Sequence, residues 1–97
     1  MPFVKQTPRL LNSQNVEILN PNQNGVYGIF SNQSWIYVGK GDIKTRLLEH
    51  LRGDIPCILR YDSLYWVDEV WENQESMDNR ERQLIIELNP ICNQRIG

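Results

Sequence analysis

The fold is decided by the stretch GVYGIFSNQSWIYVGKG, which occupies residues 25 to 41. Its two outer parts, 25–30 and 35–38, are apolar, aromatic and β-branched, which is typical of β-strands. The polar group 31–34 between them is a turn signal. Two strands joined by four residues predict an antiparallel hairpin, and we expect Gly39-Lys40-Gly41 to end its second strand.

A helix is expected directly after the hairpin. Asp42 is a candidate N-cap for a helix over about 43–52, and Gly53 is placed to stop it. The next ten residues, 54–63, contain Pro56 and give an ambiguous pattern in which a short helical turn is one option.

A third strand and a second helix complete the predicted domain. Side chains alternate over 64–71, which predicts a strand, and an apolar stripe predicts a helix over about 74–88. The order β-β-α-β-α indicates an α+β domain with a three-stranded antiparallel sheet flanked by helices. With 97 residues there is room for one domain, at 25–97. It follows an N-terminal extension, 1–24, that could add a short strand or lean against the core.

Composition and cysteine usage restrict the class of protein. No apolar run approaches the ~20 residues that cross a bilayer, so we expect no membrane contact. The first residues lack the apolar stretch of a secretory signal, and a cytoplasmic location is expected. Cys57 and Cys92 are therefore expected to be reduced thiols, with a single disulfide as the alternative. With one histidine in the chain, a structural zinc site is not expected.

The net charge of −2, from 10 basic and 12 acidic residues, is unusual for a protein that binds phosphates. From Lys40 to Arg52 there are four basic residues and two acidic ones, whereas from Arg60 to Arg82 there are three basic and seven acidic. Any phosphate-binding face is therefore expected on the first half of the domain, with modest and salt-sensitive affinity.

Three groups of residues are candidates for a functional role, although each also has a structural explanation when it is taken alone. Glu81 lies on the apolar stripe of the second helix, where a carboxylate needs a partner, a proton or a metal ion; the alternative is a carboxylate at the stripe's edge, paired with an arginine. Arg46 and His50 share a helix face. They either form an anion-binding site or are a solvated arginine beside a partly buried histidine. Tyr27 and Tyr37 lie beside glycines in the hairpin. Their hydroxyls either have a function, or the two rings simply pack in the core.

These positions together resemble the GIY-YIG nuclease superfamily. Its two naming motifs read here Gly25-Val26-Tyr27 and Tyr37-Val38-Gly39. The family pattern continues with an arginine in the first helix, a glutamate in the second and an asparagine after a proline near the end of the domain, which here are Arg46, Glu81 and Asn93. The resemblance covers residues 25 to 94. The step from the second tyrosine to the arginine is about one residue shorter than in common members, and no separate DNA-binding domain is expected within this chain.

The resemblance implies a metal-dependent endonuclease that hydrolyses phosphodiester bonds in DNA. Tyr27 would be the general base or would orient the attacking water, and Tyr37 would help to position that water or the scissile phosphate. Arg46 would bind the phosphate and stabilise the transition state. Glu81 would hold one divalent cation per site, Mg²⁺ or Mn²⁺, whose affinity we expect to tighten when DNA is bound. His50 would assist the base.

The remaining implied roles belong to residues around this set. Lys40 and Gly39 would contact the substrate with Arg46, and Asn93 would hold the local backbone. Because an unperturbed tyrosine has a pKa of about 10, we expect Arg46 and a bound cation to lower the pKa of Tyr27. The alternative is a non-catalytic adaptor or nucleic-acid-binding module that keeps the nuclease fold. A targeting partner protein, a homodimer and cleavage of RNA stay open.

Overall fold

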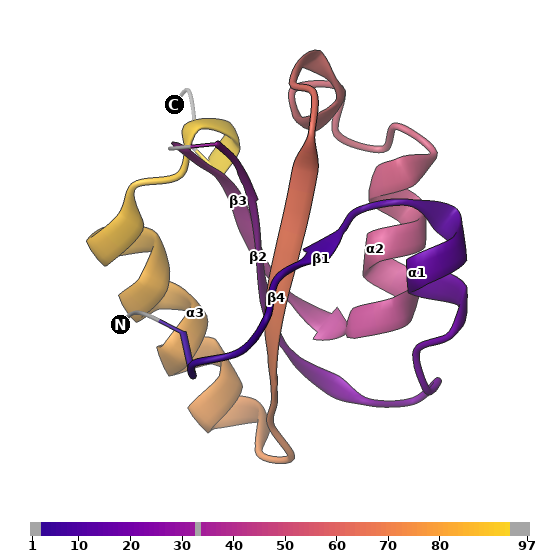
Figure 1. The fold of residues 1–97 in the computed structure, drawn as a ribbon. Helices are drawn as coiled ribbons and strands as arrows, with labels where there is room; N and C mark the ends of the chain where they lie inside the picture. Colours follow the sequence, from indigo (N-terminus) through magenta and orange to yellow (C-terminus); the bar gives the residue numbers. More distant parts are fainter. Residues whose placement is uncertain (1–2, 33, 94–97) are drawn as a thin grey trace.

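The computed structural model describes residues 3–32 and 34–93, which fold around one antiparallel sheet (Figure 1). The strands are β1 (Arg9–Leu10), β2 (Asn24–Ser31), β3 (Ser34–Asp42) and β4 (Leu64–Val70), in the spatial order β1-β4-β2-β3. The helices are α1 (Ser13–Glu17), α2 (Ile43–Leu51) and α3 (Gln74–Leu88), and the two 3₁₀ turns are η1 (Ile58–Arg60) and η2 (Ile91–Asn93). Helix α3 covers one face of the sheet, and α1 and α2 cover the other (Figure 1).

The predicted α+β class is confirmed, but the sheet has four strands where three were expected. The additional strand, β1, comes from the N-terminal extension and pairs with β4, Arg9 lying opposite Trp66. The guanidinium of Arg9 lies 4.8 Å from the centroid of the Trp66 ring and forms an ion pair of 3.2 Å with Asp68. A short strand was one of two options left open for the extension, but a strand of two residues shows no apolar alternation, so the sequence pattern could not decide between them.

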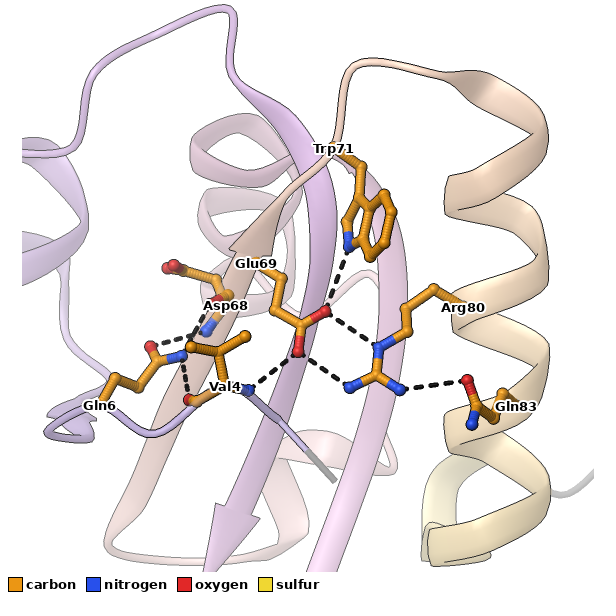
Figure 2. A network of polar contacts seen from close by, with 7 residues as sticks. All are labelled: Val4, Gln6, Asp68, Glu69, Trp71, Arg80 and Gln83. Atoms are coloured by element: carbon orange, nitrogen blue, oxygen red, sulfur yellow. Dashed lines mark hydrogen bonds and ion pairs between the residues drawn. The ribbon is translucent and has the colours of Figure 1, made fainter. Parts of the chain in front are cut away.

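A buried carboxylate ties the segment before β1 to the rest of the molecule (Figure 2). Glu69 on β4 accepts hydrogen bonds from the backbone N–H of Val4 at 2.9 Å and from the indole of Trp71 at 3.1 Å. It also accepts two from the guanidinium of Arg80 on α3, each at 3.0 Å. Burial opposes ionisation of this carboxyl, but the bonds from Arg80, Val4 and Trp71 outweigh it and hold the pKa of Glu69 below its usual value.

The predicted hairpin is confirmed, but its second strand is longer than expected. β3 continues through Gly39-Lys40-Gly41 to Asp42, so the prediction that these residues end the strand is wrong. Glycine weakens a strand unless another group approaches its backbone closely. Here a Cβ atom on Gly39 would lie 2.6 Å from Cζ of Tyr27, because the tyrosine ring occupies that space. The glycine therefore accommodates a neighbouring ring and does not interrupt the strand.

A β-bulge in the hairpin decides which side chains face which layer. The register shifts at residues 29–30 of β2, whose partners are Tyr37 and Trp35, and Ile36 is the extra residue. Paired residues share a face of the sheet, so Tyr37 lies on the α2 face with Tyr27. Trp35 turns to the α3 face, although strict alternation would put residues 35 and 37 on the same side.

Both long helices begin and end close to the predicted residues. The side chain of Asp42 accepts a hydrogen bond of 3.3 Å from the N–H of Thr45 and caps α2, and Gly53, with φ +93°, follows the end of that helix. α3 ends at Leu88, and its C-cap residue Asn89 takes the left-handed conformation with φ 47°. Within the two described ranges, no helix is long and apolar enough to cross a membrane.

Cys57 and Cys92 form a disulfide, with their Cα atoms 5.7 Å apart. The prediction of two reduced thiols is therefore wrong. The bond joins the loop between α2 and η1 to the η2 turn after α3, two segments that are 35 residues apart in sequence. The sequence shows this separation, but only the fold brings the two Cα atoms within bonding range.

Candidate active site

Three rings of the predicted site meet on the α2 face of the sheet. Tyr27 comes from β2, Tyr37 from β3 and His50 from α2. Their ring centroids are 6.3 Å apart for the two tyrosines, 5.6 Å for Tyr27 and His50, and 5.0 Å for Tyr37 and His50. Tyr27 and His50 are both 0% exposed, whereas Tyr37 is half-buried. The cluster therefore reaches the surface through Tyr37.

A chain of hydrogen bonds runs through the imidazole. The hydroxyl of Tyr27 lies 2.6 Å from Nε2 of His50, and Nδ1 of His50 lies 2.8 Å from Oδ1 of Asp54. The sequence interpretation did not include Asp54. A usable signal was present, since Asp54 follows the histidine by four residues and comes after Gly53, where a helix ends and the chain can turn back.

The guanidinium of Arg46 lies beside both tyrosine hydroxyls and favours their ionised forms. It is about one-third exposed and forms an ion pair of 2.5 Å with Glu49, one turn further along α2. The arginine is therefore available to an anion from solvent, provided that the anion displaces the partly exposed carboxylate of Glu49.

The pKa values of the three rings indicate neutral side chains. Burial, together with Tyr37, raises the pKa of Tyr27 far above its usual value, although Arg46 acts in the opposite direction. The expected lowering by Arg46 is present, but burial outweighs it, so the expected net direction differs from the one in this structure. Burial also raises the pKa of Tyr37. Burial lowers the pKa of His50, although Asp54 favours the protonated form.

Glu81 and Lys40 lie on the other face of the edge strand. Lys40 pairs with Val26 in the hairpin, and its Nζ lies 2.7 Å from Oδ1 of Asp78 and 3.4 Å from Oε1 of Glu81, both on α3. The side chain of Glu81 is 22% exposed. Glu81 therefore lies at the edge of the apolar stripe and pairs with a lysine. The structural explanation of Glu81 predicted this position but named an arginine as its partner.

The charge of Glu81 acts on Tyr37 across the edge strand. β3 is the edge strand, and the negative charge of Glu81 contributes to the raised pKa of Tyr37 on the opposite face. The structure thus gathers Tyr27, Tyr37, Arg46 and His50 directly, and brings Glu81 to the same edge from α3.

Asn93 holds the backbone of β3 between Tyr37 and Gly39. Its Oδ1 accepts a hydrogen bond of 2.6 Å from the N–H of Val38, and its Nδ2 donates one of 2.9 Å to the Val38 carbonyl. An edge strand has backbone groups without a strand partner, and this amide side chain satisfies two of them. Asn93 follows directly after Cys92, so the disulfide also fixes the position from which Asn93 binds the backbone of Val38.

Comparison with solved structures decides the fold. The chain is similar to crystal structures of three point mutants of the GIY-YIG N-terminal endonuclease domain of UvrC from Thermotoga maritima, with TM-scores of 0.69, 0.66 and 0.66. Each match has 24% sequence identity and covers 86% of this chain and 96% of that one. The chain has the GIY-YIG nuclease fold. No family model and no curated protein matches the sequence.

The UvrC domain is described in all three structures as bound to a catalytic divalent cation, which raises the question of a cation site in this GIY-YIG fold. Across residues 3–32 and 34–93, no three His, Cys, Asp or Glu side chains form a cation cage. Glu81 nevertheless offers a partly exposed carboxylate, with that of Asp78 one turn away and the Lys40 ammonium beside both. Mg²⁺ commonly takes one or two carboxylates and completes its shell with water and phosphate oxygens, so the two carboxylates fit a weakly held cation once the Lys40 ammonium is displaced from them.

Proposed function

We propose that this protein is a divalent-metal-dependent endonuclease that hydrolyses phosphodiester bonds in DNA. The observation that carries the proposal is the convergence of Tyr27, Tyr37, Arg46 and His50 on one face of a GIY-YIG fold. A purely structural core would not require a buried phenol, a buried imidazole and an arginine to meet at one place.

Tyr27 acts in this proposal as a neutral phenol and passes a proton on. Its raised pKa argues against a standing phenolate at neutral pH. When its O–H donates to Nε2 of His50, the oxygen keeps lone pairs that can accept a hydrogen bond from the attacking water. Because Tyr27 is buried, that water reaches its oxygen only when Tyr37 moves aside. As the water attacks phosphorus, its proton moves to the Tyr27 oxygen and the phenol proton moves to Nε2. The imidazole of His50 is therefore the final base. Its lowered pKa keeps it neutral before the reaction, so it is able to accept the proton.

The other residues bind and orient the phosphate. Arg46 exchanges Glu49 for the non-bridging phosphate oxygens and stabilises the charge that develops on them. Tyr37, at the surface of the cluster, orients the water or the phosphate, and Lys40 and Gly39 contribute substrate contacts at the same edge of β3. Glu81 would hold the cation, Mg²⁺ or Mn²⁺, which supplies positive charge near the leaving oxygen.

A plasmid-nicking assay tests the proposal. The wild-type protein is expected to nick supercoiled DNA with Mg²⁺ or Mn²⁺ and to stop when a chelator is added. Glu81→Ala is expected to lose at least about 100-fold in rate, as for loss of an electrostatic group at the reacting centre. Glu87→Ala is the matched control, because Glu87 is an exposed carboxylate on the same helix. Equal rates for wild type and Glu81→Ala would refute the role of Glu81.

The competing function is that of a non-catalytic adaptor or nucleic-acid-binding module. It is favoured by the net charge of −2 and by the pairing of Arg46 with Glu49 and of Lys40 with Asp78 and Glu81. Absence of cleavage on supercoiled, linear and branched DNA and on RNA, with binding retained, would establish the adaptor and overturn the nuclease. Because the net charge is −2 and both Arg46 and Lys40 are paired with carboxylates, we further propose that a partner protein or a second copy of the chain directs this protein to DNA, in the cytoplasm.

A further inference from the structure

We propose that Asp54 is a positioning residue, which fixes the tautomer of His50 and thereby the direction of the hydrogen bond between His50 and Tyr27. The catalytic consequence rests on the proposed nuclease function, whereas the tautomer itself is a property of the folded chain. Asp54 lies outside the set of residues that the family resemblance implied.

The local backbone brings Asp54 back onto the helix. Gly53 takes φ +93°, in the region that favours glycine, and turns the chain after the last turn of α2. The N–H of Asp54 then donates to the carbonyl of Glu49 at 3.2 Å, which fixes the position of its backbone. As a result the carboxylate reaches Nδ1 of His50 at 2.8 Å, while the Asp54 side chain stays one-third exposed to water.

The carboxylate decides which ring nitrogen carries the proton. An ionised carboxylate can only accept a hydrogen bond, so the neutral imidazole must present Nδ1–H to Asp54. Nε2 is then bare and can only accept, so the Tyr27 hydroxyl at 2.6 Å must donate to it. The phenol oxygen is left with its lone pairs free to receive a proton from the attacking water, as the proposed mechanism requires.

Asp54 has a second effect once His50 has accepted the proton. The titratable and charged groups that surround the ring are Tyr27 on β2, Tyr37 on β3, Arg46 and Glu49 on α2, and Asp54. Arg46 disfavours the imidazolium, whereas Asp54 and Glu49 favour it, and Asp54 is the carboxylate hydrogen-bonded to the ring. Asp54 therefore stabilises the charged product of the proton transfer.

Asparagine in place of Asp54 tests the tautomer directly. The Asn side chain can offer an N–H donor to Nδ1, which moves the ring proton to Nε2 and reverses the hydrogen bond with Tyr27. His50 is the one histidine of the chain, so ¹⁵N correlation spectra of the imidazole are unambiguous. We expect protonated Nδ1 and bare Nε2 in the wild type and in the charge-matched control Asp62→Asn, an exposed site, and the opposite tautomer in Asp54→Asn. Protonated Nε2 in the wild type, or the same tautomer in all three proteins, would overturn the inference.

Kinetics on the same proteins measure the catalytic consequence. Asp54→Asn is expected to lower kcat at least about 100-fold with little change in KM, as for a base held in the wrong tautomer. Asp54→Glu, which keeps the carboxylate, is expected to recover part of the rate. Because Asp54 favours the protonated imidazole, the acid limb of the pH–rate profile is expected at lower pH in Asp54→Asn. Unchanged kcat and an unchanged acid limb, with the tautomer reversed, would contradict the kinetic role of Asp54. A wild type that cleaves no nucleic acid would instead overturn the proposed function and leave the tautomer result standing.

Discussion

At the scale of single residues, the sequence predicted which side chains come together but not the environment that controls their pKa values. The two tyrosines, the arginine and the histidine were predicted from type and spacing, and the fold brings all four together. The direction of the Tyr27 pKa could not be predicted, because it depends on how completely the phenol is buried. Asp54 was missed for a related reason, since its contact with His50 depends on one glycine conformation.

The glycine beneath Tyr27 gives a prediction at this scale. In Gly39→Ala the new methyl group would lie 2.6 Å from Cζ of Tyr27 and 2.8 Å from Cε2 of Tyr37, so both rings must shift. Overpacking of this kind costs about 1–3 kcal/mol of unfolding free energy, which urea denaturation measures. We also expect at least a tenfold loss of single-turnover rate, since displacements of about 1 Å at a reacting centre are costly. Wild-type stability and rate in this variant would show that Tyr27 does not need the space above Gly39.

At the scale of elements, alternation and capping signals located both long helices and three of the four strands. They failed where a tertiary contact overrides local propensity. β3 runs through two glycines because Tyr27 fills the space that a side chain at position 39 would need. The bulge at Ile36 separates the faces of Trp35 and Tyr37, and no periodic pattern contains it.

The Glu69 network, which joins β4, α3 and the N-terminal segment, predicts a pH dependence of stability. In the folded protein the pKa of Glu69 is held below the unfolded value of about 4.3. The ionised carboxylate therefore stabilises the fold above that pH, and this stabilisation is lost as the pH falls through the folded pKa. We expect the unfolding free energy to drop below about pH 4.3, with a smaller drop in Glu69→Gln. Glu69→Gln is also expected to cost about 3 kcal/mol at pH 7, because it breaks the buried ion pair between Glu69 and Arg80.

Glu72→Gln is the control for this experiment, since Glu72 is exposed and lies three residues from Glu69. Its pH dependence should follow that of the wild type. An equal acid response in the wild type and in Glu69→Gln would mean that other carboxyls carry the effect.

At the scale of the whole molecule, the fold class followed from the order of the elements, but the covalent link between distant segments did not. The disulfide joins residues on the loop after α2 and the turn after α3, and the reduced-thiol prediction rested on the expected compartment. Geometry was the missing information, because two cysteines bond only where the folded backbone brings them together.

Reduction of this disulfide is expected to destabilise the protein. For a loop of 35 residues the entropic contribution is about 3–4 kcal/mol, which urea denaturation with and without a phosphine reductant would measure. The double variant Cys57→Ser/Cys92→Ser should match the reduced protein and should not respond to the reductant. Alkylation of both thiols in the folded protein without any reductant, detected as a mass shift, would contradict the bond.

Groups on both faces of the β3 edge strand are proposed to act as one active site, and a double-mutant cycle between the two faces tests whether they do. Single-turnover cleavage of duplex DNA would be measured for the wild type, Tyr27→Phe, Glu81→Gln and the double variant. We predict that each single change lowers the rate at least about 100-fold. The double variant should cleave much faster than the rate obtained by multiplying the two single losses, because both groups act on one transition state. Strictly multiplicative losses, or a wild-type rate in either single variant, would contradict the account.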